Sequence, residues 1–145
     1  MKIRIALITF LSTIMLGAFL LPAVAATDFA KSVSKDDAQK ITWQLPEVKA
    51  WAELIEKQSK GTVHGASKID ADTPETIGGK RYWSVTCFVD YPEQIHRWHT
   101  FMIRLDGKEI LADSVASGNF TQLEKWRLSE KPMQEMNRAA PNAPD

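Results

Sequence analysis

The chain has 145 residues, with 18 basic and 18 acidic side chains and a formal charge of zero. Lys2 and Arg4 lie in the N-terminal leader described below, so the rest of the chain keeps 16 basic against 18 acidic side chains, a formal charge of −2. Such a balance gives no field that would hold nucleic acid or an anionic membrane surface, and it excludes both as partners. No motif specifies a cofactor.

The N-terminus has the pattern of a secretory signal peptide. A short basic start precedes an apolar run over residues 5–21 that carries no charge. Small residues then fit the A-x-A rule equally well for cleavage after Ala25 or after Ala26. We therefore expect residues 1–25 to be removed. The mature protein is expected in a periplasm, with the extracellular space as the alternative, and without a stable membrane anchor.

The mature chain has the length of one domain, expected over residues 26–130. Its roughly 120 residues bury about two-thirds of the surface that the unfolded chain exposes. A single cysteine, Cys87, cannot form an internal disulfide, so the fold depends on its hydrophobic core. Residues 131–145 are rich in Pro, Ala, Asn and charge and show no periodicity, which predicts a disordered tail.

One amphipathic helix is predicted over residues 47–60. Pro46 suits the first helical turn, and Gly61 suits the left-handed stop. A helix of this size does not stay folded alone, so its apolar stripe must pack on a sheet. The stripe consists of Val48, Trp51, Leu54, Ile55 and Gln58.

Two capping-box patterns predict shorter helices on either side of the sheet. Ser34 with Asp37 marks a helix start before residue 47. Thr121 with Glu124 marks a short C-terminal helix over residues 122–127.

Residues 80–117 predict an antiparallel meander. Three runs of aromatic and β-branched residues are separated by turn formers at 91–93 and 106–107. An irregular edge strand over 62–77 precedes them. The predicted class is α+β, with one helix packed on a three- to four-stranded antiparallel meander and a short C-terminal helix. This order resembles small cystatin-like or PepSY-type envelope domains in architecture only, and architecture of that kind does not carry function.

Loop lengths decide the register of the meander, because side chains alternate strictly along a strand. A loop with an odd number of residues between the first two strands places Val85 opposite Phe101. A two-residue turn between the next two strands places Ile103 opposite Ile110. The core face then carries Trp83, Val85, Cys87, Val89, Phe101, Ile103, Ile110 and Ala112.

Cys87 and His99 are the residues that would carry chemistry. In the predicted register they lie directly across from each other, and a thiol beside an imidazole can act as a nucleophile with its base. No third catalytic residue can be named, and a free cysteine among apolar residues is normally a small hydrophobe. His96 and His99 point to opposite faces of a strand, so no metal site is predicted.

The second face of the sheet is too apolar for open solvent. Either the helix over residues 122–127 covers it, or it binds another protein or a second copy of the chain. Aromatic residues and methionine concentrate binding energy at interfaces. The predicted binding residues are Trp98, Phe88, Met102, Tyr82 and Leu111.

The sequence therefore predicts a small exported, non-catalytic binding module. It would act through this aromatic sheet face, in the manner of an inhibitor or immunity-type protein. The alternative is a small thiol or hydrolytic enzyme that uses Cys87 and His99.

Overall fold

The computed structural model describes residues 32–91 and 93–139. The leader predicted for residues 1–25 lies outside them. The described residues form four helices and a six-stranded antiparallel sheet, which confirms the α+β class with more strands than the three or four expected. None of these helices is long and apolar enough to span a bilayer. The elements are α1 (Lys35–Gln44), α2 (Pro46–Gln58), β1 (Gly65–Ile69), β2 (Glu75–Ile77), β3 (Lys80–Tyr91), β4 (Gln94–Arg104), β5 (Ile110–Asp113), β6 (Phe120–Gln122), α3 (Leu123–Glu130) and α4 (Pro132–Ala139).

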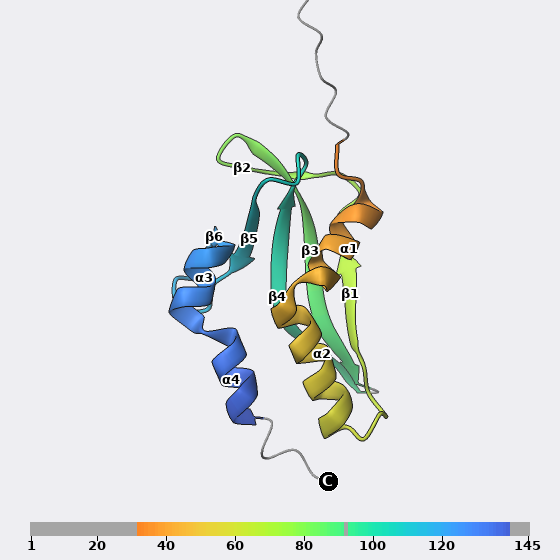
Figure 1. Cartoon of the computed structure of the whole chain (residues 1–145). Helices are drawn as coiled ribbons and strands as arrows, with labels where there is room; N and C mark the ends of the chain where they lie inside the picture. The colour runs from red at the N-terminus through yellow and green to blue at the C-terminus, as the bar shows by residue number, and fades with distance from the viewer. Residues whose placement is uncertain (1–31, 92, 140–145) are drawn as a thin grey trace, which may run out of the picture.

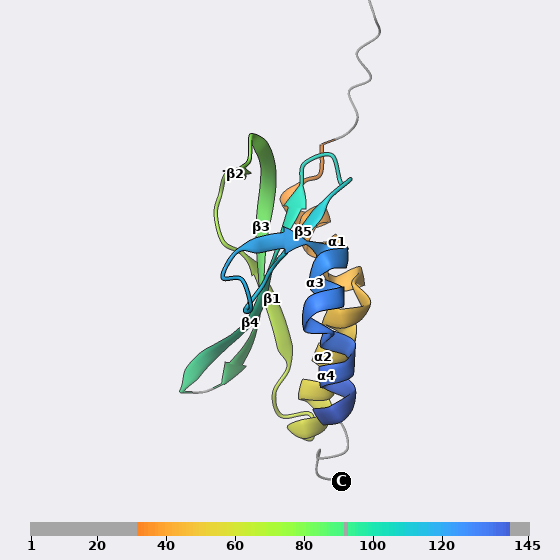
Figure 2. The same ribbon diagram turned by 90° about the vertical axis from the view of Figure 1, so that its left-hand side faces the viewer.

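One face of the sheet is covered by helices, and the other is not. Its strand order is β1-β3-β4-β5-β6, and β2 pairs with the beginning of β3 (Figure 1). All four helices lie on the same side of the sheet, so the other face carries no helix (Figure 2). We call this uncovered face the helix-free face.

Local signals place the first two helices where the sequence predicts them. The side chain of Ser34 accepts the amide of Asp37 at 3.1 Å, and the Asp37 carboxylate accepts the amide of Ser34 at 3.4 Å. Pro46 opens α2 at its first turn. The expected capping box at Thr121 is wrong. Thr121 pairs with Ala112 in the sheet, and α3 starts without a side-chain cap.

The hydrophobic core lies between the helices and the sheet and contains every residue of the predicted core face except Ile110, which is partly buried and packs against it. The α2 stripe packs against it through Val48 and Trp51. Trp126 of α3 is fully buried there, 5.7 Å from the ring of Phe101. The C-terminal helix therefore covers the core face, and it does not roof the helix-free face.

Residues 132–139 form α4, where the sequence predicts a disordered tail over 131–145. Met136 is buried, and α4 lies beside α2. Composition alone misses such a helix because two buried residues, Pro132 and Met136, are enough to seat a short helix on an existing layer. Proline is also favoured at the first turn, where Pro132 stands.

The register of β3 and β4 matches the prediction near the core. Val85 lies opposite Phe101, as expected. At the hairpin end Tyr91 pairs with Gln94, so two residues separate the strands and the loop is even rather than odd. A register shift beside Cys87 reconciles the two ends.

This shift is a β-bulge in β4. Thr86 pairs with Thr100 and Phe88 pairs with Arg97, which leaves Trp98 and His99 together opposite Cys87. A bulge reverses the alternation of side chains and bends its strand. The hairpin end beyond the bulge accordingly curves away from the helices (Figure 2). The predicted one-to-one pairing of Cys87 with His99 is therefore wrong.

Asp113, at the end of β5, holds the bulge together. Its Oδ1 accepts hydrogen bonds from the amide of Thr100 at 2.9 Å and from Nδ1 of His99 at 2.8 Å, and its Oδ2 pairs with Arg97. Burial is the largest single influence on the pKa of Asp113 and would raise it. The hydrogen bonds from His99 and Thr100, with the charges of His99 and Arg97, outweigh burial and hold this pKa below its usual value.

Candidate functional site

The five residues predicted to form the binding surface do not lie together. Tyr82, Met102 and Leu111 form a small buried cluster on the helix-free face, and Met102 is fully inaccessible to a partner. Phe88 lies half-buried on the same face. Trp98 lies on the opposite face, because the bulge turns it toward the core. Its indole stacks on Trp51 with 4.7 Å between ring centroids.

A network of charges closes the end of the helix-free face beside Tyr82. The carboxylate of Glu109 accepts hydrogen bonds from Lys80 at 2.9 Å, from the Tyr82 hydroxyl at 2.8 Å and from Arg104 at 3.1 Å. Hydrogen bonds from Lys80 and Tyr82 lower the pKa of Glu109 to about 2. Arg104 also binds Asp106 through two nitrogens.

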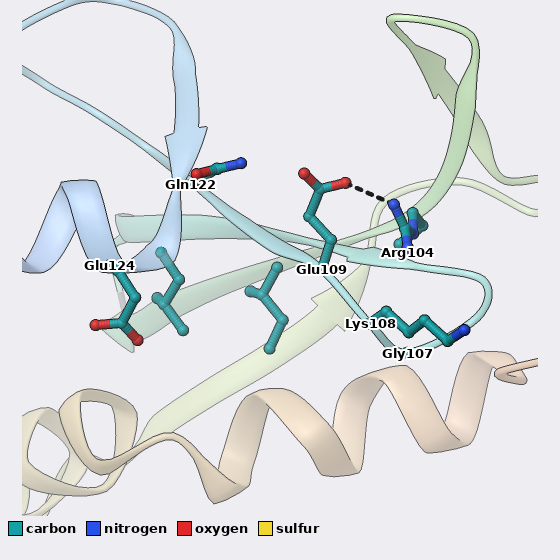
Figure 3. Close-up of a pocket in the computed structure, with 8 residues that line it drawn as sticks. Arg104, Gly107, Lys108, Glu109, Gln122 and Glu124 are labelled. Atoms are coloured by element: carbon teal, nitrogen blue, oxygen red, sulfur yellow. Dashed lines mark hydrogen bonds and ion pairs between the residues drawn. The ribbon is translucent and has the colours of Figure 1, made fainter.

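Figure 3 shows the hollow beside this network, with Glu109 directed at Arg104 and with Gln122 and Glu124 on the other side. The hollow measures about 430 Å³. Glu109 and Arg104 are already hydrogen-bonded to each other, and this contact joins the two ends of the turn between β4 and β5. Few of their polar atoms remain to bind a ligand.

A second hollow lies on the helix-free face around the middle of β3 and β4. We call it the sheet-face depression, and it measures about 360 Å³. Ser84, Thr86 and Thr100 form its floor, each with at most 7 % of its surface exposed. Larger side chains surround this floor: Lys68, Asp70, Glu75, Phe88, Ile95, Arg97 and Phe120.

Asp70 organises the floor. The hydroxyls of Ser84 and Thr86 both donate to its Oδ2 at 2.7 Å, and its own amide donates to the carbonyl of Ser84 at 3.0 Å. The hydroxyl oxygens of Thr86 and Thr100 lie 2.7 Å apart. The floor is thus a connected polar network from β4 across β3 to the segment after β1.

Apolar side chains stand exposed on the rim of the depression. Ile95 is 63 % exposed and Phe120 is 37 % exposed, and Phe88 is half-buried beside them. Exposed apolar side chains that gather on one surface are typical of a surface that meets a partner.

Sequence reasoning found only part of this site. Alternation along β3 places Ser84, Thr86 and Phe88 on one face, and that is where they lie. Asp70 falls in the stretch expected to be an irregular edge strand, and nothing in its local sequence points to the hydroxyls it binds. Ile95 reaches this face only because the hairpin has an even loop before the bulge.

Cys87 lacks the properties of a catalytic thiol. It is fully buried, and burial, with the nearby charge of Asp113, raises its pKa to about 12. No hydrogen bond joins it to His99 among the described residues, and the His99 ring packs edge-on against Trp126 at 5.0 Å. A nucleophilic cysteine needs thiolate character and access to substrate. The described residues also include no group of three or more His, Cys, Asp or Glu side chains placed to hold a metal ion.

Comparison with known proteins finds no family model, no curated protein and no solved structure that matches this chain.

Proposed function

We propose that the protein is an exported, non-catalytic binding module whose helix-free face binds another protein. The sheet-face depression is the observation that carries the proposal. It combines a satisfied polar floor with three accessible apolar side chains, Phe88, Ile95 and Phe120. Export is inferred from the leader pattern of residues 1–25, with the periplasm as the favoured compartment.

The arrangement of layers supports a protein partner. An antiparallel sheet can leave one face to water when that face is mostly polar. Here Ile95 and Phe120 break that rule at the rim, while the floor remains polar. Protein interfaces mix apolar and polar side chains and are enriched in aromatic residues, and the lining of the depression contains both kinds.

The projecting hairpin supports an inhibitor or immunity-type mode of binding. The ends of β3 and β4 curve away from the helices, and Tyr91 near the tip is 38 % exposed (Figure 2). A two-stranded projection of this kind suits entry into a cleft of another protein. The helix layer on one side of an antiparallel sheet also agrees with a cystatin-like or PepSY-like architecture, which we propose for the fold at that level only.

Site-specific photo-cross-linking tests the proposal. The photoreactive residue p-benzoylphenylalanine replaces Phe88, Ile95 or Phe120, one position at a time, and the purified protein is irradiated in an extract of the cells that produce it. We expect the same cross-linked protein from all three positions.

Glu53 provides the matched control, because it is exposed on α2 in the layer on the other side of the sheet. The same substitution there should give no product of that mass. A product of twice the chain's own mass from the three sheet positions would show that the partner is a second copy of this chain. Cross-links from position 53 alone, or from none of the four positions, would contradict the proposal.

A further inference from the structure

The hydroxyl groups on the floor of the sheet-face depression all donate their hydrogen bonds in the direction of Asp70. Ser84 and Thr86 donate theirs to Oδ2 of Asp70. A hydroxyl carries one proton, so Thr86 has none left for Thr100 and can only accept from it. The chain of donation therefore runs from Thr100 to Thr86 to the carboxylate of Asp70.

What this network leaves to a ligand is a set of acceptors. The oxygens of Ser84 and Thr100 keep free lone pairs. Within residues 32–91 and 93–139 nothing donates to Oδ1 of Asp70, and nothing pairs with the side chain of Glu75 on the rim. A ligand group that reaches the floor must donate hydrogen bonds, because an acceptor would meet only lone pairs there.

The charges on the rim favour a cation. Asp113 pairs with Arg97. The remaining charged groups of the lining are the carboxylates of Asp70 and Glu75 and the ammonium of Lys68. The ammonium of Lys68 already lies over the ring of Phe88, 6.0 Å from its centroid. The chain thus contains one example of a cation attracted to this rim.

We infer that the depression binds an arginine side chain of the partner protein. A guanidinium carries five donors in a planar fork, stays charged, and stacks on aromatic rings such as those of Phe88 and Phe120. Lysine offers a more compact, more strongly hydrated charge, and a neutral amide leaves the charge of Asp70 unanswered. The inference rests on the proposed function and adds to it the residue type that the partner must present.

A model compound tests the site without knowledge of the partner. N-acetyl-arginine-N-methylamide is titrated into the ¹⁵N-labelled mature protein, and amide shifts are followed by NMR. We expect saturable shifts at Thr86, Phe88 and Thr100. The citrulline compound has the same shape without the charge, and it should bind at least about tenfold more weakly, since hydrogen bonds to charged groups are roughly twice as strong. The lysine compound should also bind more weakly.

Charge variants give effects of opposite sign. Asp70→Asn should weaken arginine binding about tenfold, and Glu75→Gln should weaken it by about threefold without touching the hydrogen bonds of the floor. Lys68→Gln should strengthen binding by a similar factor, because it removes a like charge from the rim. Glu53→Gln, on the helix layer, makes the same change in net charge as Asp70→Asn and Glu75→Gln and should leave the affinity unchanged.

Each result bears on the inference separately from the proposed function. Equal binding of the citrulline or lysine compound, or unchanged affinity in both Asp70→Asn and Glu75→Gln, would overturn the assignment of arginine. Specific arginine binding with no cross-linked partner at Phe88, Ile95 or Phe120 would keep the cation site and remove the protein-binding function. Cross-links from those positions without arginine binding would keep the protein-binding function and overturn the assignment of arginine.

Discussion

Replacing Trp51 by alanine is expected to lower the free energy of unfolding by about 3–5 kcal/mol, a large part of the stability of a domain this size. Trp51 is buried between the ring of Trp98, 4.7 Å away and parallel to it, and the backbone of Gly65. A Cβ built on Gly65 would stand 2.7 Å from the Trp51 ring, so the slot has no spare room. Removal of the indole therefore leaves a cavity that rigid neighbours cannot fill. Urea denaturation followed by far-ultraviolet circular dichroism measures the loss.

Leu128 is the control for this variant, because it is 77 % exposed on α3. Leu128→Ala should change the free energy of unfolding by no more than about 0.5 kcal/mol. A loss below about 1 kcal/mol for Trp51→Ala would show that α2 and the bulged strand do not meet through these two indoles.

The second large effect is expected from Asp113→Ala. This change removes the acceptor for the amide of Thr100 and for the imidazole of His99, both of which are buried, together with the partner of Arg97. A buried donor left without an acceptor costs about 1–3 kcal/mol, and we expect a total near the upper end of that range. Chemical denaturation of both proteins at pH 7 measures the difference.

The pH dependence of that difference distinguishes a charge effect from lost packing. The pKa of Asp113 in the folded protein lies below its usual value of 3.8, so its contribution is present above that value and is lost as pH falls through the folded pKa. The difference in the free energy of unfolding between the two proteins should therefore be largest at pH 7 and become smaller below about pH 4. Asp106 and Glu109, whose pKa values both fall to about 2, titrate in both proteins and cancel. A gap of constant size down to pH 2 would contradict the account.

The core of this fold follows from alternation and periodicity. Val85, Phe101 and Ile103 must share a face because large apolar side chains at every second position cannot all meet water. The α2 stripe is equally determined, since its spacing of three and four residues leaves Val48 and Trp51 no other side to occupy. These features depend only on local pattern, and each appears in the structure.

The helix-free face could not be obtained in the same way. The pairing of Val85 with Phe101 needs an odd loop, while Tyr91 and Gln94 make an even one. Both are satisfied only if β4 contains one extra residue, and no glycine between them marks where that residue lies. Alternation carried past this point assigns Trp98 to the wrong face.

Long-range polar contacts were also out of reach. Asp70 and Thr86 are joined across two strands, and a carboxylate in an irregular segment gives no sign of which hydroxyls it binds. The acceptor floor of the depression depends on that contact. The site was therefore predictable in its location on the second face and in Phe88, but not in its chemistry.

The site and its proposed function both depend on the bulge opposite Cys87, and cross-strand backbone NOEs measure that bulge directly. The bulged register predicts contacts that pair Phe88 with Arg97 and Val89 with His96. A regular ladder would instead pair Phe88 with Trp98. Contacts of that second kind would return Trp98 to the face of the depression and contradict the account.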